Sequence, residues 1–488
     1  MQIYHVVIIT LVVLLGLLAI KTPVALCLGL SGGLGLILLK GFGYGTNTLA
    51  SVPFTTTASF TLTIIPMFIL MGMLAMRANI AENVFAVANH FVRRAPGGLA
   101  VATVMACAGF AAVSGSSIGT AATMAKLSVS QMRAKGYPAS LATGVVAIAG
   151  TLGVMIPPST FLVFYAILAG ESVAQMLAAG IIPGLLSALG YILYIMIAGH
   201  RSIRPGTAEQ DLVGGIEDAR AELRTKKLIG KRSAGTEEPG GKVARTNAGT
   251  ATAAVNTTAA DERTSLRALP WRGVVHIGII FVVVLGGMYS GVFTSTESAA
   301  IGALAALIIL VIEHRRRGLR NILKTFRQAL LDTSETTAMV FFIVIGSTVL
   351  STFFVAAGVT QSVTNWVSGF PFPPMLVMAI LLLCLIPLGM FLESFSILVI
   401  TVPILYPIAM EFGFDGVWLG IIVIKLIEIG MVTPPVGIIA FVVAGATGVR
   451  TETVFRGVLP LVVIDLIMTT ILFLFPAITL YLPSLVRQ

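Results

Sequence analysis

Apolar residues occur in long tracts along this 488-residue chain, and one hydrophilic segment divides the tracts into two groups. Such runs predict transmembrane helices. They exclude a water-soluble enzyme and a β-barrel, whose strands alternate polar and apolar side chains. The tracts before the segment are 3–20, 24–39, 59–76, 98–113, 140–156, 160–169 and 181–199. The tracts after it are 273–292, 298–312, 337–357, 375–392, 395–410, 416–432, 436–448 and 457–484.

Several tracts are shorter than the roughly 17 to 25 residues that a helix needs to cross a bilayer. Short tracts separated by Gly, Ser and Pro predict re-entrant hairpins and broken helices, whose freed backbone groups must be satisfied by protein or a water-filled cavity. The predicted fold is an all-α polytopic membrane protein. We divide it into an N-terminal half (1–200), a hydrophilic linker (201–271) and a C-terminal half (272–488).

Charge is scarce and unevenly placed. Hydrophobic residues make up 57% of the chain and charged residues 11%, with a mean hydropathy of +0.98 and a formal net charge of +10. Of the 31 basic and 21 acidic side chains, 13 and 9 lie between Arg201 and Arg272, which predicts a disordered cytoplasmic linker. The remaining basic groups cluster in short loops such as 314–320, where the positive-inside rule explains them, so we expect no nucleic-acid partner.

An internal repeat relates the two halves at an offset of 277 residues. The matching pairs are 136–144 with 413–421, 153–159 with 430–436, Gly180 with Gly457, and Pro183 with Pro460. Upstream of each Pro-Pro pair lies a break, SGSS (114–117) in the first half and LGMFLES (388–394) in the second. Repeats of this kind are typical of secondary transporters, which bind substrate and coupling ions at broken helices near the membrane midplane.

The breaks are rich in uncharged oxygen atoms. Pro157 and Pro158 lack a backbone N–H, so carbonyl groups one turn earlier lose partners within the helix. Freed carbonyls and Ser or Thr hydroxyls suit a hard cation such as Na⁺, and a helix N-terminus at a break favours an anion. The simpler alternative is that small residues pack helices closely and the prolines only kink one. Because both halves repeat the arrangement, we favour an ion and substrate site.

Ionisable residues at membrane depth are costly and usually functional. Glu393 lies within the second break, and we expect it to contact substrate or an ion. Lys425 and Glu428 are three residues apart on one helix, and we predict that they neutralise each other. Glu297 and Asp465 lie near tract ends, where helix capping or snorkelling explains them.

The residues do not suggest an enzyme or an organic cofactor. The five histidines are scattered, which gives a Ser–His pair or a zinc site little support. An intramembrane hydrolase with Ser116 of the SGSSIG turn as nucleophile is a remote alternative. A passive channel fits less well, because repeated broken helices indicate an enclosed site instead of a continuous pore.

Six motifs carry a family resemblance. They are SGSSIGTAATM (114–124), GYPASLATG (136–144), GTLGVMIPPS (150–159), GMFLES (389–394), VPILYPI (402–408) and EIGMVTPPVG (428–437). Together they resemble the large membrane subunit of the tripartite ATP-independent periplasmic (TRAP) transporters, the DctM-like family. The resemblance covers almost the whole chain apart from the linker.

The resemblance implies a Na⁺-driven importer of organic anions, such as C4-dicarboxylates, sugar acids or other small carboxylates, in the bacterial inner membrane. It implies two inverted repeats with re-entrant hairpins and an elevator-type mechanism, as in the ion-transporter superfamily. A periplasmic binding protein would deliver the substrate, and a small four-helix membrane subunit would brace the scaffold as a separate chain. A stand-alone Na⁺/carboxylate symporter is the alternative.

The resemblance also implies two Na⁺ sites and a substrate site. The first Na⁺ site is expected at Ser114, Ser117, Gly153, Ile156 and Pro158. The second is expected at Gly389, Gly430, Thr433 and Val436. Substrate contacts are expected from Ser116, Ser159 and Glu393. Three positions depart from the family pattern, since Glu393 stands where Asp is common, and Leu426 and Ile439 stand where Asn is common.

Overall fold

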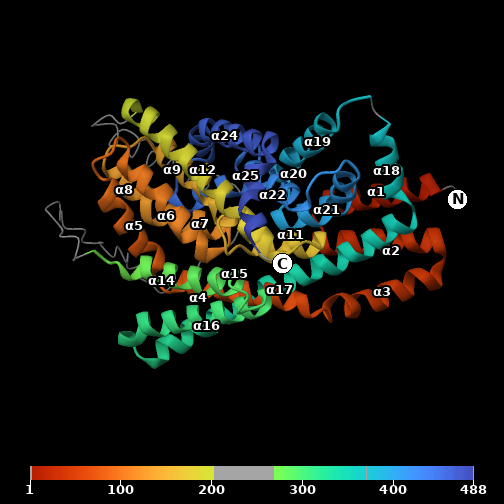
Figure 1. Cartoon of the computed structure of the whole chain (residues 1–488), viewed down its shortest axis with the longest axis horizontal. Coiled ribbons are helices and arrows are strands. Elements are labelled where there is room, and N and C mark those ends of the chain that lie inside the picture. The colour runs from red at the N-terminus through yellow and green to blue at the C-terminus, as the bar shows by residue number, and fades with distance from the viewer. Residues whose placement is uncertain (1–2, 203–268, 370, 487–488) are drawn as a thin grey trace, which may run out of the picture.

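The computed structural model describes residues 3–202, 269–369 and 371–486, so most of the predicted linker lies outside the described residues (Figure 1). Within these ranges every regular element is a helix. Eight helices of the described part of the chain are long and apolar enough to cross a membrane, or nine if the bent pair Ala139–Met155 and Thr160–Ala169 is one span. The predicted all-α polytopic class is confirmed.

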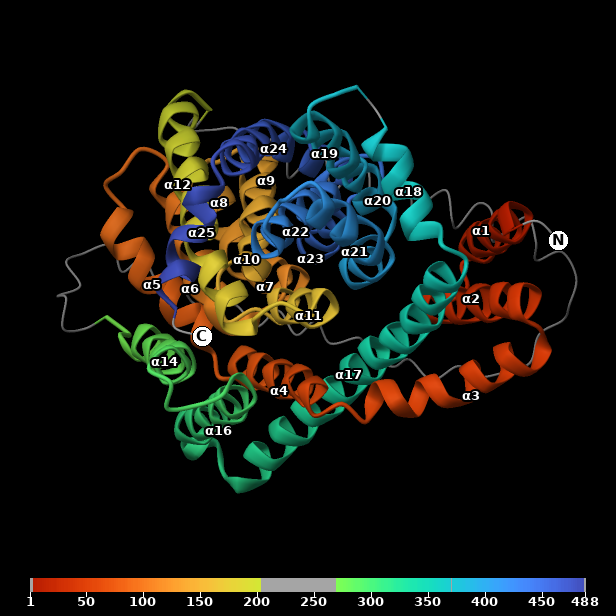
Figure 2. The ribbon, with the colours of Figure 1, turned by 45° about the vertical axis from the view of Figure 1, so that its right-hand side comes forward.

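One group of helices forms an elongated layer, which we call the outer layer (Figures 1 and 2). Its helices are α1 (Ile3–Ala19), α2 (Val24–Lys40), α3 (Phe42–Thr57), η1 (Phe60–Thr63), α4 (Ile64–Arg77), α14 (Arg272–Phe281), η4 (Val282–Gly286), α15 (Gly287–Tyr289), α16 (Ser295–His314), η5 (Arg315–Arg317), α17 (Leu319–Ala356) and α18 (Val359–Ser368). Figure 2 shows α17 running diagonally along this layer, where it packs against α2, α3 and α4. The long α17 therefore ties the early helices to those that follow the linker.

The remaining helices form a thicker group, the inner body. Its helices are α6 (Gly98–Ser114), α7 (Ser117–Met124), η2 (Ala125–Val129), α8 (Ser130–Ala134), α9 (Ala139–Gly150), α10 (Leu152–Met155), α11 (Thr160–Ala169), α12 (Val173–Ser202), α19 (Pro374–Leu383), α20 (Leu385–Phe391), α21 (Ser394–Glu411), α22 (Gly416–Val432), α23 (Ile438–Thr447), α24 (Thr451–Leu474) and α25 (Pro476–Leu485). The helix α5 (Ile80–Val92) packs on both α6 and α14 and so links the body to the layer.

Helix boundaries in the inner body repeat at the offset that the sequence indicates. The boundaries that match 277 positions apart are, in pairs, Ser114 with Phe391, Ser117 with Ser394, Ala139 with Gly416, and Met155 with Val432. The first two pairs are the ends of the helices at the hairpin tips, and the last two bound the helices before the Pro-Pro breaks. Both Pro-Pro peptide bonds, 157–158 and 434–435, are cis. The repeat therefore extends to the hairpins, where the sequences share little besides small residues.

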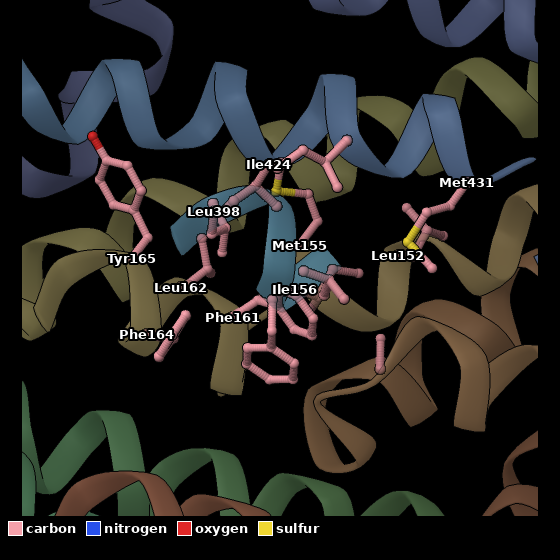
Figure 3. Close-up of a cluster of buried hydrophobic side chains, with 14 of the residues drawn as sticks. Leu152, Met155, Ile156, Phe161, Leu162, Phe164, Tyr165, Leu398, Ile424 and Met431 are labelled. Carbon is pink, nitrogen blue, oxygen red and sulfur yellow. The ribbon is translucent and has the colours of Figure 1, made fainter. Parts of the chain in front are cut away.

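An apolar cluster joins the first half of the inner body to the second (Figure 3). The rings of Phe161 in α11 and Phe395 in α21 are stacked with centroids 4.0 Å apart, and Phe164 meets Phe395 edge-on. The Tyr165 hydroxyl donates to the Gly416 carbonyl over 2.8 Å, which fixes α11 against the start of α22. Buried aromatic pairs add to the stability gained from apolar burial, so the helix after the first break is held by the second hairpin.

Several element boundaries differ from the tracts that the sequence predicts. The helices α3 and α5 were not predicted, because polar side chains interrupt their apolar stretches. The helix α17 begins at Leu319, 18 residues before the predicted tract, because no Gly or Pro interrupts its polar first half. The last tract is split at Pro476, which begins α25. Of the three cysteines, Cys384 is exposed, whereas Cys27 and Cys107 are buried.

Candidate functional site

The first hairpin tip is a tight turn between α6 and α7. Gly115 ends α6 in the left-handed conformation (φ 58°), which a glycine adopts without strain. The Ser114 hydroxyl lies 2.6 Å from that of Thr120, and the Ser116 side chain caps α7 by accepting from the Gly119 N–H over 3.2 Å. Three hydroxyl oxygens thus gather at the tip, and the free N–H groups of α7 lie beside them.

The first Pro-Pro break lies against this tip. A Cβ added to Gly153 would lie 2.6 Å from the Ser116 carbonyl oxygen and 2.8 Å from Thr120 Oγ1, so only glycine allows this approach. The Thr160 hydroxyl donates to the Gly115 carbonyl over 3.0 Å and joins the start of α11 to the tip. Sequence positions more than thirty residues apart therefore present carbonyl and hydroxyl oxygens to one small region.

The residues expected at the first Na⁺ site are placed unequally. Ser114 and Gly153 both adjoin Thr120. A Cβ on Gly115 would lie 3.5 Å from the Pro158 carbonyl oxygen, so that carbonyl also faces the tip. The Ile156 side chain instead faces Gly184 of α12, which leaves only its backbone for such a site.

In the second half, too, a helix of the hairpin packs closely against the helix that ends at the Pro-Pro break. A Cβ on Gly389 of α20 would lie 3.0 Å from Gly430 Cα of α22, so the two helices touch through these glycines. Thr433 follows the end of α22, and its hydroxyl donates to the Ile429 carbonyl over 2.5 Å. Val436 lies in the irregular segment before α23, which begins at Ile438. Three of the four residues expected at the second Na⁺ site thus lie along one short stretch of chain at the end of α22.

The three residues expected to contact substrate are all N-caps of helices. Ser116 caps α7, Ser159 caps α11 and Glu393 caps α21. Ser159 is fully buried and accepts from the Leu162 N–H over 3.4 Å. The Glu393 carboxylate accepts from the Ser396 N–H over 3.3 Å. Because a helix N-terminus attracts negative charge, α7 and α11 offer positions for an anion, whereas α21 already has its own carboxylate.

The predicted pairing of Lys425 with Glu428 is wrong. The Lys425 ammonium forms an ion pair with Asp465 and donates to the Ser187 hydroxyl over 2.9 Å. Asp465 is fully buried in α24 instead of capping a helix end, so that expectation is also wrong. Spacing on one helix cannot reveal a partner on another. The capping role of Glu297 is confirmed, since it forms a capping box with Thr294.

Sequence reasoning missed the position of Glu428. Its carboxylate is buried, and its Oε1 atom accepts hydrogen bonds from the Ser117 and Ser394 hydroxyls over 3.4 and 3.3 Å. These serines begin α7 and α21, 277 positions apart. The repeat register already places them at equivalent positions, and that was the signal available for finding the cluster.

A cleft of about 550 Å³ lies between α17 of the outer layer and the inner body. Ser347, Ser351 and Val355 of α17 line one side, and Leu168 of α11 and Pro403 of α21 line the other. An adjacent cavity of about 480 Å³ continues along the same two surfaces. The two parts are therefore incompletely packed where α17 faces the second hairpin.

Paired hairpin tips and broken helices inside a polytopic helical body define a transporter permease. The family model described as "Tripartite ATP-independent periplasmic transporter, DctM component" matches residues 11–478, and the chain belongs to this family. The family and the membrane-spanning helices place it in the bacterial inner membrane. The family consists of large permease components of secondary transporters.

Curated relatives match over nearly the whole chain. The C4-dicarboxylate TRAP transporter large permease protein DctM of Pseudomonas aeruginosa is 33% identical over 94% of this chain and 93% of its own length. The sialic acid TRAP transporter large permease protein SiaM of Vibrio cholerae is 28% identical over 96% and 97%. In fold, the chain resembles the YdaH transporter of Alcanivorax borkumensis, with a TM-score of 0.56 and 13% identity over 91% of this chain and 90% of that one.

Proposed function

We propose that this chain imports a small organic anion and that Na⁺ moving inward drives the import. The observation that carries the proposal is the pair of repeat-related regions where a hairpin tip meets a broken helix and uncharged oxygens converge. Such oxygens are ligands for Na⁺. Because these ligands are uncharged, none of them adds the roughly 2.5 to 3.5 kcal/mol that a charged side chain costs at mid-bilayer on the translocon scale.

The two proposed Na⁺ sites follow the two repeats. Ser114, Ser117 and carbonyl groups near Gly153, Ile156 and Pro158 form the first, and Gly389, Gly430, Thr433 and Val436 form the second. In each site a close approach between helices supports the assignment, at Gly153 in the first and between Gly389 and Gly430 in the second. Glycine at these positions lets the helices approach until backbone carbonyl oxygens lie at the contact, that of Ser116 in the first site and those of Ile386 and Ile427 in the second.

The proposed substrate is a C4-dicarboxylate or a related carboxylate or sugar acid. The N-termini of α7 and α11, capped by Ser116 and Ser159, suit a carboxylate because their free N–H groups carry partial positive charge. Relatives are named for C4-dicarboxylate, sialic acid and 2,3-diketo-L-gulonate, all of which are organic acids. Glu393 adjoins this region and would orient the substrate or a neighbouring cation.

The proposed mechanism is an elevator movement of the inner body against the outer layer. The cleft between α17 and the second hairpin supports it, because incompletely packed surfaces can slide. We further propose two partners, a periplasmic binding protein that delivers the anion and a small four-helix membrane subunit that braces the outer layer.

Uptake into proteoliposomes tests the proposal. The full chain, reconstituted with the two proposed partners, should accumulate radiolabelled succinate or sialic acid only under an inward Na⁺ gradient. Unchanged uptake after choline replaces Na⁺ would contradict Na⁺ coupling. Uptake by the chain without a binding protein would instead indicate a stand-alone symporter.

A further inference from the structure

Glu428, Ser117 and Ser394 form a cluster between the hairpin tips, which we call the tip clasp. Ser117 is the first residue of α7 and Ser394 the first residue of α21, so each hairpin contributes the same repeat position. Both hydroxyls donate to one atom, Glu428 Oε1. Ser394 also contacts the Met431 sulfur, one turn further along α22. The clasp therefore joins two tips that are far apart in sequence to one helix.

The carboxylate has no counterpart in the other repeat. The position equivalent to Glu428 is Thr151, between α9 and α10, whose hydroxyl donates to the Ile148 carbonyl of α9 over 2.6 Å. The C-terminal half thus places the Glu428 carboxylate between the hairpin tips. At the equivalent position the N-terminal half has Thr151, a neutral residue whose hydroxyl bonds to a nearby backbone carbonyl. Only one of the two repeats has a carboxylate at this position, so the packing that both repeats share does not require it. The carboxylate therefore indicates an additional role.

Among the described residues, no basic side chain forms an ion pair with Glu428. Glu428 is 3% exposed, and its Oε2 atom has no hydrogen-bond partner among the described residues. Lys425, one turn earlier on α22, is held by Asp465 and Ser187. Because an isolated buried charge is costly, a cation bound nearby would stabilise the ionised form of Glu428.

We propose that Glu428 is the positioning residue that couples the two Na⁺ sites, an inference that rests on the proposed function. Ser117 belongs to the first site, and α22 continues from Glu428 to Gly430 and Thr433 of the second. The carboxylate attracts a cation to each site, and its Oε1 atom keeps both tips closed. A Na⁺ ion at one site therefore stabilises the arrangement that the other site needs.

Equilibrium binding of ²²Na⁺ alone, measured on the full chain in lipid nanodiscs, tests the coupling. The wild type should bind Na⁺ with a Hill coefficient above one. Glu428→Gln removes the charge but keeps an oxygen that accepts from both serines, so the half-saturating Na⁺ concentration should rise about tenfold while the Hill coefficient is retained. Ser394→Ala keeps the charge but frees the second tip, so the Hill coefficient should fall toward one.

Glu171→Gln is the matched control. Glu171 accepts from the Tyr406 hydroxyl near Gly416, at the far end of α22, about 18 Å along the helix from Glu428. Its Na⁺ binding should equal that of the wild type. If the wild type binds no Na⁺, the proposed function fails. If the wild type binds Na⁺ and both Glu428→Gln and Ser394→Ala bind it identically, only the coupling is overturned. If Glu428→Gln does not fold, an unchanged Hill coefficient in Ser394→Ala overturns it.

Discussion

At each Pro-Pro break one threonine hydroxyl donates its proton to a backbone carbonyl, which leaves the lone pairs of its oxygen free to accept. The Thr433 hydroxyl donates to the Ile429 carbonyl, and the Thr160 hydroxyl donates to the Gly115 carbonyl. An oxygen oriented in this way is prepared for a cation without any rearrangement. Each hydroxyl thus bonds a Pro-Pro break to the neighbouring backbone and still offers its oxygen as a ligand for a cation.

Thr433→Ala should weaken Na⁺ binding. Loss of one oxygen ligand should raise the half-saturating Na⁺ concentration for uptake about tenfold, which corresponds to about 1.4 kcal/mol. Thr433→Ser retains the hydroxyl and should behave like the wild type. Thr447→Ala is the control, because the Thr447 hydroxyl makes the same type of backbone bond, to the Val443 carbonyl, at the other end of α23. Wild-type Na⁺ dependence in Thr433→Ala would remove Thr433 from the second site.

The sequence identifies residue types at the site better than their contacts. The repeated Ser, Gly and Pro positions are visible because flexible turns and missing N–H groups require those residue types. The contacts of Lys425, Glu428 and Asp465 are not visible, because each partner lies on another helix and spacing along one helix reveals only local pairs.

At the scale of the elements, apolar composition predicts most of the spanning helices and both breaks. The ends of α22 and α23 agree with the predicted tracts within two residues. Apolar composition does not predict α3, α5 or the first half of α17. Their sequences mix polar and apolar residues, and tertiary packing stabilises them as helices. In α17 such packing includes the hydrogen bonds of Arg77 in α4 to Gln328 and Asp332.

The ion pair of Lys425 and Asp465 fixes α22 against α24, and Ser187 adds α12. Lys425→Met should destabilise the protein by about 3 to 5 kcal/mol, because Asp465 would be left as an unpaired buried charge. The double variant Lys425→Met with Asp465→Leu should recover most of this loss. Thermal unfolding in detergent measures both. Equal midpoints for Lys425→Met and the wild type would show that the pair does not stabilise the packing of these helices.

At the scale of the whole molecule, the division into an outer layer and an inner body follows from which helices pack together. The sequence predicts two halves along the chain, but each half contributes to both structural parts (Figure 2). The outer layer combines the first four helices with α14 to α18. This mixing of helices from the two halves depends on contacts between residues far apart in the sequence, which local sequence patterns do not reveal. It also forms the cleft between α17 and α21.

A cross-link across that cleft should stop transport if the inner body moves. Leu168 of α11 and Ser351 of α17 line the same cavity from opposite sides. In a background with Cys384→Ser, the pair Leu168→Cys and Ser351→Cys treated with a cleavable bifunctional thiol reagent should lose uptake. Reduction should restore it, because cleavage of the spacer releases α11 from α17.

The pair Arg77→Cys and Asp332→Cys is the control for this experiment. Both residues belong to the outer layer and already form an ion pair, so a link between them joins surfaces that the elevator mechanism keeps together. Loss of the partly exposed ion pair costs little. Uptake should therefore persist after cross-linking of this pair. Full cross-linking between positions 168 and 351 with unchanged uptake would show that transport proceeds without sliding of the inner body along α17.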